Sequence, residues 1–349
     1  MSTPTQQKAL LLLAKQGDFA VQTRPVPTPG PGELLVRNEA SGLNPVDWKI
    51  QAYGLFLKDY PAVLGTDAAG VIVAVGEGVP TWQVGDRVLY EGRQHIDRAT
   101  FQQYALVDAD FVAKVPDSLT FEQAASIPLA LTTAAVGLYN QAGGPRFTPP
   151  WVEGSRFKYA GPIVVIGGSS VVGSLALQLS RLSGFSPIIT TASLKNAELL
   201  IGFGATHVLD RNLSASALRE QVFELAGGAV SVVYDAISLP ETQNAAFDLL
   251  GKDGKLLTVL APAVDEDKQK NANGRTVVTI AGHILRPENQ DFGRGLFSKL
   301  TGLLKNGDLK PLHVELESGG LAGIPAGLNR LKNNQVSASK VVVQPQETA

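Results

Sequence analysis

The chain of 349 residues is long enough for two folded domains, because single hydrophobic cores rarely grow beyond about 250–300 residues. Hydrophobic residues make up 44% and charged residues 18%, which excludes a disordered chain, and 30 Lys and Arg against 32 Asp and Glu give no basic excess for nucleic acid. There is no cysteine, which excludes disulfides, thiolate nucleophiles and cysteine-based zinc sites. With no signal-like start and no apolar run of about 18 residues, we expect a cytoplasmic protein without a membrane anchor or a bound metal.

The first third of the chain predicts short strands. Apolar or β-branched runs occur at 9–14, 34–37 and 68–75, and residues 82–88 have the pattern of a turn that leads into a strand. Prolines and glycines separate these runs, most densely at 25–33. The pattern is typical of a barrel-like β domain.

The middle of the chain has helical spacing over 121–139, interrupted at Pro128, and then a loop-like stretch at 141–162. Beyond it, short apolar strands alternate with helices. Strands are expected at 163–166, 187–191, 207–209, 230–234, 255–259 and 276–280, and helices at 171–182, 197–203, 216–226 and 241–250. This alternation predicts an α/β domain with a doubly wound parallel sheet. A further helix is expected at 297–304, and a last strand at 340–343 lies outside the alternation.

The turn after the first strand of this series is rich in glycine. Its residues are Gly167, Gly168, Ser169, Ser170, Val171 and Val172, followed by Gly173. Glycines allow a tight turn and a close backbone approach to a pyrophosphate, which the N–H groups at the start of the next helix would bind. The spacing departs from G-x-G-x-x-G, so the alternative is a plain strand–turn–helix. The strand–helix units that follow favour dinucleotide binding.

The second strand of the series ends at Ser193 without the carboxylate that NAD-preferring sites place there to hold the ribose 2′-OH. No acidic residue appears before Glu198. Ser193 and Lys195 suit a 2′-phosphate, and Arg211, just after the third strand, could contact the same phosphate or the adenine. The alternative is that Lys195 and Arg211 are solvated surface residues.

Polar residues gather beside glycines in two segments of the first domain, 41–49 and 64–70. We expect Asn44, Asp47, Lys49 and Thr66 to converge on a cleft. The alternative for Asn44 and Asp47 is an Asx-turn beside Pro45.

These segments carry a resemblance to the zinc-free medium-chain dehydrogenases/reductases. The sequence most resembles the quinone oxidoreductases and the fungal trans-acting enoyl reductases of polyketide pathways, over nearly its whole length. The residues that carry the resemblance lie at 44–49, 65–70, 84–88, 101–104, 124–128, 133–134, 167–173, 191–193, 204–206 and 337–343.

The resemblance implies a GroES-like β-barrel catalytic domain at 1–127, a Rossmann NADP-binding domain at 128–305, and a return to the catalytic domain at 306–349. That return accounts for the strand at 340–343. Zinc-dependent relatives place a cysteine near Asn44 and a His-Glu pair near Thr66 and Asp67. None of these positions matches here, so no metal site is expected.

The activity that the resemblance implies is NADPH-dependent hydride transfer to an activated C=C bond (an enone, enal or enoyl thioester) or to a quinone. Negative charge then develops on the carbonyl oxygen, and without a metal it needs hydrogen-bond donors. In the matching segments the catalytic candidates are Lys49, Asn44, Thr133 and Tyr53, with the nicotinamide near Thr132. Lys49 is preferred because it is the only cation of the 44–49 segment, and the alternative for it is a solvated lysine at the barrel edge.

Two other functions remain open at this point. One is a non-catalytic NADPH-binding relative that acts as a sensor or partner protein, and the other is a zinc-free carbonyl reductase. We expect a small-molecule substrate, a monomer or homodimer, and no nucleic acid or membrane partner. A partner synthase is a further option for which the sequence holds no specific motif.

Overall fold

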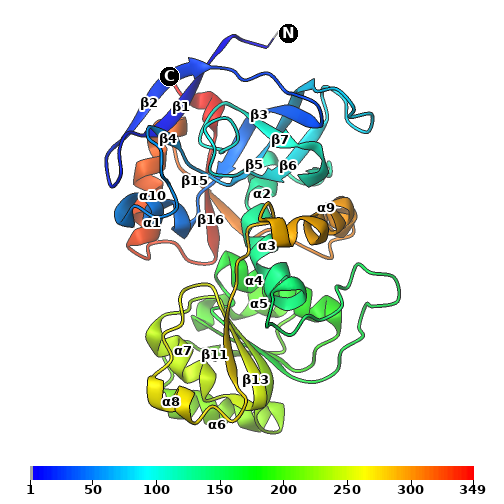
Figure 1. The fold of residues 1–349 in the computed structure, drawn as a ribbon. Helices are drawn as coiled ribbons and strands as arrows, with labels where there is room; N and C mark the ends of the chain where they lie inside the picture. The colour runs from blue at the N-terminus through cyan, green and yellow to red at the C-terminus, as the bar shows by residue number, and fades with distance from the viewer. Residues whose placement is uncertain (1–2) are drawn as a thin grey trace. The chain divides into compact units, whose positions relative to one another are not determined.

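The computed structural model describes residues 3–349, which form two compact units (Figure 1). The first unit contains the chain up to Leu129 together with Gly293–Lys305 and Pro311–Ala349. The second contains Ala130–Phe292 and Asn306–Lys310.

The first unit is built on two β-sheets. The larger sheet has the order β15-β16-β3-β5-β6-β8, with β7 also paired to β3, and the smaller has the order β2-β1-β4. Its strands are β1 (Gln6–Leu12), β2 (Phe19–Pro25), β3 (Glu33–Gly42), β4 (Ala62–Val63), β5 (Asp67–Val75), β6 (Arg87–Glu91), β7 (Tyr104–Asp108), β8 (Val112–Lys114), β15 (His313–Leu316) and β16 (Ser339–Val343). The expected barrel-like β domain is confirmed.

The helices of the first unit pack beside these sheets. They are α1 (Pro45–Tyr53), α2 (Phe121–Ala125), α10 (Ile324–Lys332) and the greater part of α9 (Gln290–Lys305). One apolar core joins β1, α1, α10 and β16, with Leu10, Ile50, Leu328 and Val341 buried in it. The strand expected at 340–343, outside the strand–helix alternation, is β16, which lies antiparallel to the end of β3 through Val342 and Gly42.

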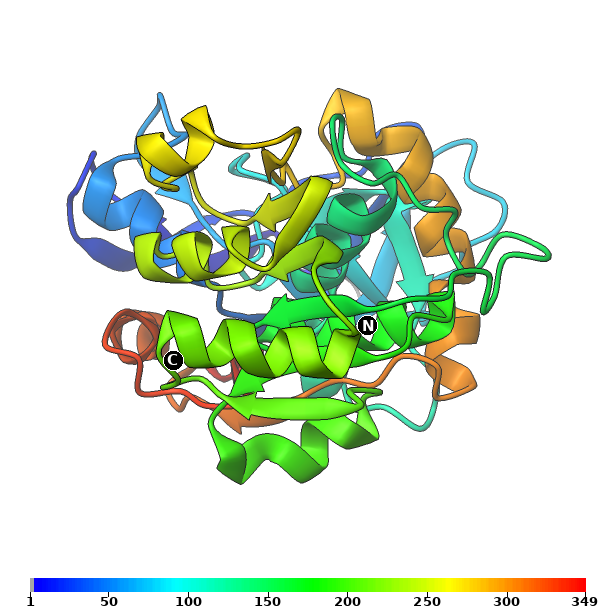
Figure 2. The same ribbon diagram turned by 90° about the horizontal axis from the view of Figure 1, so that it is seen from below.

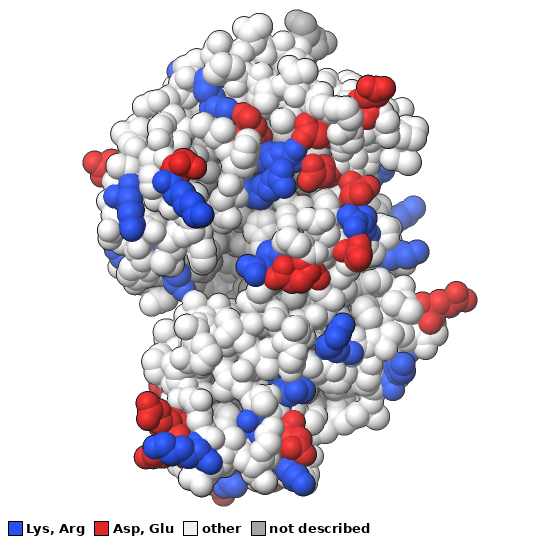
Figure 3. Space-filling view, viewed as in Figure 1, with Lys and Arg blue, Asp and Glu red and all other residues white. Residues whose placement is uncertain are grey.

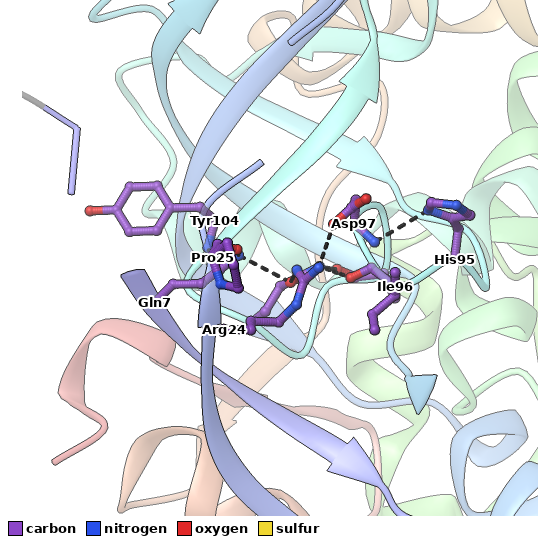
Figure 4. A network of polar contacts seen from close by, with 9 residues as sticks. Gln7, Arg24, Pro25, His95, Ile96, Asp97 and Tyr104 are labelled. Atoms are coloured by element: carbon purple, nitrogen blue, oxygen red, sulfur yellow. Dashed lines mark hydrogen bonds and ion pairs between the residues drawn. The ribbon is translucent and has the colours of Figure 1, made fainter. Parts of the chain in front are cut away.

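Polar side chains fix the loop that follows β6 (Figure 4). The Arg24 guanidinium contacts Asp97 and donates a hydrogen bond to Gln102 Oε1 at 2.7 Å. The backbone N–H of Asp97 donates to His95 Nδ1 at 3.3 Å. His95 thereby serves the conformation of its own loop.

The second unit contains a six-stranded parallel sheet of order β11-β10-β9-β12-β13-β14. Its strands are β9 (Ile163–Ile166), β10 (Ile188–Ala192), β11 (His207–Asp210), β12 (Val230–Asp235), β13 (Leu250–Thr258) and β14 (Thr276–Thr279). The order reverses between β9 and β12, as in doubly wound dinucleotide-binding domains. The predicted parallel sheet is confirmed.

Helices cover both faces of this sheet (Figure 2). The helices of the second unit are α3 (Pro128–Ala135, from Ala130 on), α4 (Val171–Ser183), α5 (Ala197–Gly202), α6 (Ala215–Ala226), α7 (Pro240–Phe247) and α8 (Glu266–Lys270). The helical stretch expected at 121–139 is divided into α2, α3 and a π-helical segment at Val136–Asn140, because Pro128 cannot continue the first helix. Among residues 3–349, no helix has the length and apolar character to cross a bilayer.

Candidate functional site

The 44–49 segment forms the start of helix α1 rather than an Asx-turn. Asn44 caps the helix in an extended conformation, and Pro45 takes the first helical position, where a missing N–H does no harm. The backbone N–H of Asn44 donates to Asp47 Oδ2 at 2.8 Å. This short sequence therefore directs Asn44 and Asp47 inward and carries Lys49 and Tyr53 along the helix.

The Asn44 side chain belongs to a buried polar cluster, which we define as Asn44, Thr66, Asp67 and Lys340. Its Nδ2 donates to Asp67 Oδ2 at 2.8 Å and lies 3.4 Å from Thr66 Oγ1. Its Oδ1 accepts a hydrogen bond from Lys340 Nζ at 2.7 Å, and the same ammonium lies 2.6 Å from Asp67 Oδ2. The amide of Asn44 is thus engaged on both of its sides.

Asp47 lies next to this cluster as a second buried carboxyl group. Burial raises the pKa of Asp47 to about 7, while the hydrogen bond from Asn44 and the positive charge of Lys340 act in the opposite direction. Its Oδ1 atom has no hydrogen-bond partner among the described residues. Asp47 therefore exchanges a proton close to neutral pH.

Lys49 and Tyr53 both lie against the indole ring of Trp48. Lys49 is half-buried, with Nζ 5.6 Å from the Trp48 ring centroid, and burial lowers the pKa of its ammonium group. The Tyr53 ring, 5.9 Å from the Trp48 ring, is 59% exposed. Lys49 is thus a partly desolvated cation and differs from a fully solvated lysine.

Thr132 and Thr133 lie in the second unit, on α3. Thr132 is buried and Thr133 half-buried. The carbonyl oxygen of Thr133 accepts a hydrogen bond from Tyr234 Oη at 3.0 Å. Gly282 lies so close that a Cβ there would be 2.6 Å from Thr133 Oγ1. The surroundings of Thr133 are therefore closely packed.

The glycine turn between β9 and α4 is held by the end of β10. The N–H of Gly167 donates to Thr191 Oγ1, and the N–H of Gly168 donates to the Thr191 carbonyl, both at 3.1 Å. Gly167 has φ +78°, and a Cβ on Gly168 would lie 2.2 Å from Thr190 Oγ1. These positions require glycine because of backbone conformation and close packing.

The first turn of α4 is suited to bind an anion. The Ser170 hydroxyl caps the helix by accepting the N–H of Gly173 at 3.0 Å. The N–H groups of Ser169, Val171 and Val172 donate no hydrogen bond to another of the described residues. Free N–H groups at the start of a helix fit the pyrophosphate of a dinucleotide, so the residues present fit a nicotinamide cofactor.

Ser193, Lys195 and Arg211 lie at one edge of the parallel sheet. Ala192 on β10 and Asp210 on β11 are register partners, and the N–H of Arg211 donates to the Ala192 carbonyl at 3.0 Å. Ser193 is half-buried, whereas Lys195 and Arg211 are exposed. The structure thus brings the three predicted 2′-phosphate residues to the same edge.

Lys340 and Asp67 are the site residues for which sequence reasoning assigned no role. One feature of the sequence could have indicated Lys340: it directly precedes three valines in a predicted strand. A charged residue in such an apolar run requires a buried partner. The partner itself lies 273 positions earlier in the chain and is not indicated by local pattern.

The polar cluster does not fit a zinc ion. Among residues 3–349, no group of three or more His, Cys, Asp or Glu side chains is placed to hold a metal. The Lys340 ammonium also occupies the space beside Asn44 Oδ1 and Asp67 Oδ2, where it would repel a cation. The residues of this cluster therefore do not support a zinc-dependent step.

Two family models match the chain. Residues 30–117 match the "Alcohol dehydrogenase GroES-like domain", and residues 171–296 match "Zinc-binding dehydrogenase". These two matches cover the first part of the β domain and most of the parallel sheet with its helices.

Curated relatives and solved structures extend the similarity to the full chain. "Trans-enoyl reductase RAP2" of Pyricularia oryzae is 30% identical, over 98% of this chain and 99% of its own. "Trans-enoyl reductase himH" of Aspergillus japonicus is 34% identical, over 89% of each. The mycobacterial protein Rv1454c, solved in complex with NADPH, is 25% identical, with a TM-score of 0.76 over 97% of this chain and 100% of its own. The chain is thus a member of the medium-chain dehydrogenase/reductase family of oxidoreductases, with a GroES-like domain and a Rossmann domain.

Proposed function

We propose that the protein is an NADPH-dependent reductase that transfers hydride to an activated C=C bond (an enone, enal or enoyl thioester) or to a quinone, without zinc. The observation that carries the proposal is the edge of the parallel sheet after β10. Ser193, Lys195 and Arg211 gather there, and no carboxylate occupies the end of β10 to hold a free 2′-OH. The names of the relatives as trans-enoyl reductases support reduction of a C=C bond.

The glycine turn and the first turn of α4 would hold the dinucleotide. The N–H groups of Ser169, Val171 and Val172 would bind the pyrophosphate, while Lys195 and Ser193 would bind the 2′-phosphate. When bound, NADPH supplies the hydride that reduces the substrate.

Lys49 stabilises the charge that develops on the carbonyl oxygen of the substrate. Its ammonium is half-buried, and an electrostatic contact is stronger there than in bulk water. We assign Thr133 and Tyr53 as further, neutral donors to the same oxygen. Asn44 has its amide engaged by Asp67 and Lys340, so we assign it a role in holding α1. We assign no side chain to protonation of the α-carbon, because water can supply that proton.

The substrate is a small molecule. On the face shown in Figure 3, acidic and basic groups are interspersed over both units, which gives no broad basic surface there for a nucleic acid.

The deciding experiment is NADPH oxidation measured against a panel of enals, enones, acyl thioesters and quinones. We expect turnover of at least one class and little with NADH. The Lys49→Met variant should lose turnover while NADPH binding is kept, and Lys58→Met, which changes an exposed lysine beyond α1, serves as the matched control. NADPH binding without turnover of any compound would instead identify a non-catalytic relative.

A further inference from the structure

Lys340 is a charged residue in an apolar strand. Its side chain is 2% exposed, and it precedes the buried residues Val341, Val342 and Val343 on β16. An ammonium group is buried in this way only when it is paired and hydrogen-bonded. Asp67, which is fully buried, and the Asn44 amide oxygen supply both requirements.

The Asp67 carboxylate connects three elements. Its Oδ2 accepts hydrogen bonds from Lys340 on β16 and from Asn44 at the start of α1. Its Oδ1 accepts the backbone N–H of Leu129 at 2.6 Å, in the first turn of α3. A carboxylate at a helix N-terminus satisfies a backbone donor and interacts favourably with the helix dipole.

The backbone leaves space for the lysine stem. A Cβ on Gly42, at the end of β3, would lie 2.8 Å from Lys340 Cε and 2.5 Å from the Ala125 carbonyl oxygen. A residue larger than glycine there would displace the lysine. The local packing therefore places the ammonium group against Asp67.

We propose that Lys340 and Asp67 form a positioning pair for the reaction: together they fix the first turns of α1, which carries Lys49, and of α3, which carries Thr132 and Thr133. The pair acts through these helices, without contact to the substrate. The kinetic part of this inference rests on the proposed function, whereas the structural part does not.

The charge of the pair makes the two residues interdependent. Removal of Lys340 alone leaves the carboxylates of Asp67 and Asp47 buried without a counter-charge, and removal of the Asp67 charge alone leaves an unpaired ammonium. Breaking a buried pair on one side is strongly disruptive, whereas removing both charges is often tolerated. A positioning pair therefore predicts that the double variant is closer to the wild type than either single variant.

The test compares Lys340→Met, Lys340→Arg, Asp67→Asn and the double variant Asp67→Asn/Lys340→Met. Lys332→Met, an exposed lysine on α10, is the matched control. Hydrogen–deuterium exchange reports the first turn of α1 and the Leu129 amide, and kinetics report kcat and the KM for NADPH. Thermal melting identifies variants that fail to fold. If Lys340→Met is one of them, the comparison is made with Lys340→Arg, which keeps the charge, and with the double variant, which has neither charge.

For Lys340→Met we expect at least tenfold faster exchange at the α1 first turn and at Leu129, with β9–β14 unchanged. We expect kcat to fall about tenfold or more and the KM for NADPH to stay within about twofold. Lys340→Arg and the double variant should recover most of the protection and turnover. Wild-type exchange at both helix starts in Lys340→Met, or additive losses in the double variant, would overturn the proposal. If the wild-type protein is inactive on every compound of the enal, enone, thioester and quinone panel, the proposed function is refuted. The hydrogen–deuterium exchange data then still test whether Lys340 and Asp67 fix the two helix starts.

Discussion

Ala192 and Asp210 face each other as register partners on two adjacent parallel strands, and the residues after them are Ser193 and Arg211. Two basic groups, Lys195 and Arg211, thereby reach the same edge of the sheet from different loops. Their separate contributions to cofactor selection can be measured.

Lys195→Ala should raise the KM for NADPH and leave the KM for NADH nearly unchanged. One charge-assisted contact to a 2′-phosphate contributes roughly 1.5–3 kcal/mol, or about ten- to a hundredfold. Steady-state kinetics with both cofactors check this, with the exposed Lys252→Ala as the control. An equal loss for both cofactors would exclude Lys195 as the phosphate contact and make Arg211 the next candidate.

Lys49→Met should lower kcat about tenfold or more at saturating NADPH, because the carbonyl oxygen loses its cationic partner. The pH profile gives a second test. Burial lowers the pKa of Lys49, so turnover should fall on the alkaline side at a lower pH than an ordinary lysine would give. Lys49→Arg keeps its charge and should move that fall to higher pH. If the wild type and the Lys49→Arg variant had identical pH profiles, the role of the ammonium group would be contradicted.

Asp47→Asn should remove a pH dependence of stability. The folded state raises the pKa of Asp47 from 3.8 to about 7, so between these values the folded state holds a proton that the unfolded state has lost. This group therefore makes the free energy of unfolding fall as the pH rises from about 4 to about 7. Denaturant titrations at several pH values should show a flatter dependence in Asp47→Asn. The same slope in both proteins would mean that Asp47 is ionised throughout.

Gly173→Ala should weaken NADPH binding by about tenfold or more and lower the melting temperature. A Cβ there would lie 2.3 Å from the Gly167 carbonyl oxygen, so the turn before α4 has to move. Gly202→Ala, at the end of α5, meets nothing within 4 Å and is the control. Fluorescence titration with NADPH measures the affinity, and thermal melting measures the stability. An unchanged affinity for NADPH would mean that this turn does not bind the cofactor.

The parallel sheet was well predicted because its signals are local. The strand over Ile163–Ile166 and the start of the helix at Val171 agree with the structure to the residue. Buried parallel strands are continuous apolar runs, and the glycines that end them mark the turns.

The first unit was predicted less completely. Helix α1 was not predicted. Its first residues were interpreted as polar groups of a cleft, with an Asx-turn as the alternative, because Asn44, Pro45 and Asp47 are typical of turns as well as of helix starts. Strands β2 and β15 and helix α10 were also not predicted. Each contains too few apolar residues to form a run or a period that would indicate a strand or a helix. The roles of Lys340 and Asp67 depend on a contact between distant segments, which no local propensity encodes.

The separation of Asp67 and Lys340 along the chain has a consequence for biosynthesis. The carboxylate of Asp67 emerges from the ribosome 273 residues before the ammonium group that neutralises it. Until β16 has been synthesised, Asp67 at the start of β5 is an acidic group without its ammonium partner, which disfavours closure of the β domain around it. The second unit is complete in sequence earlier, at Lys310, and can fold first. We therefore expect the first unit to be completed last, after the chain has been translated through Lys340.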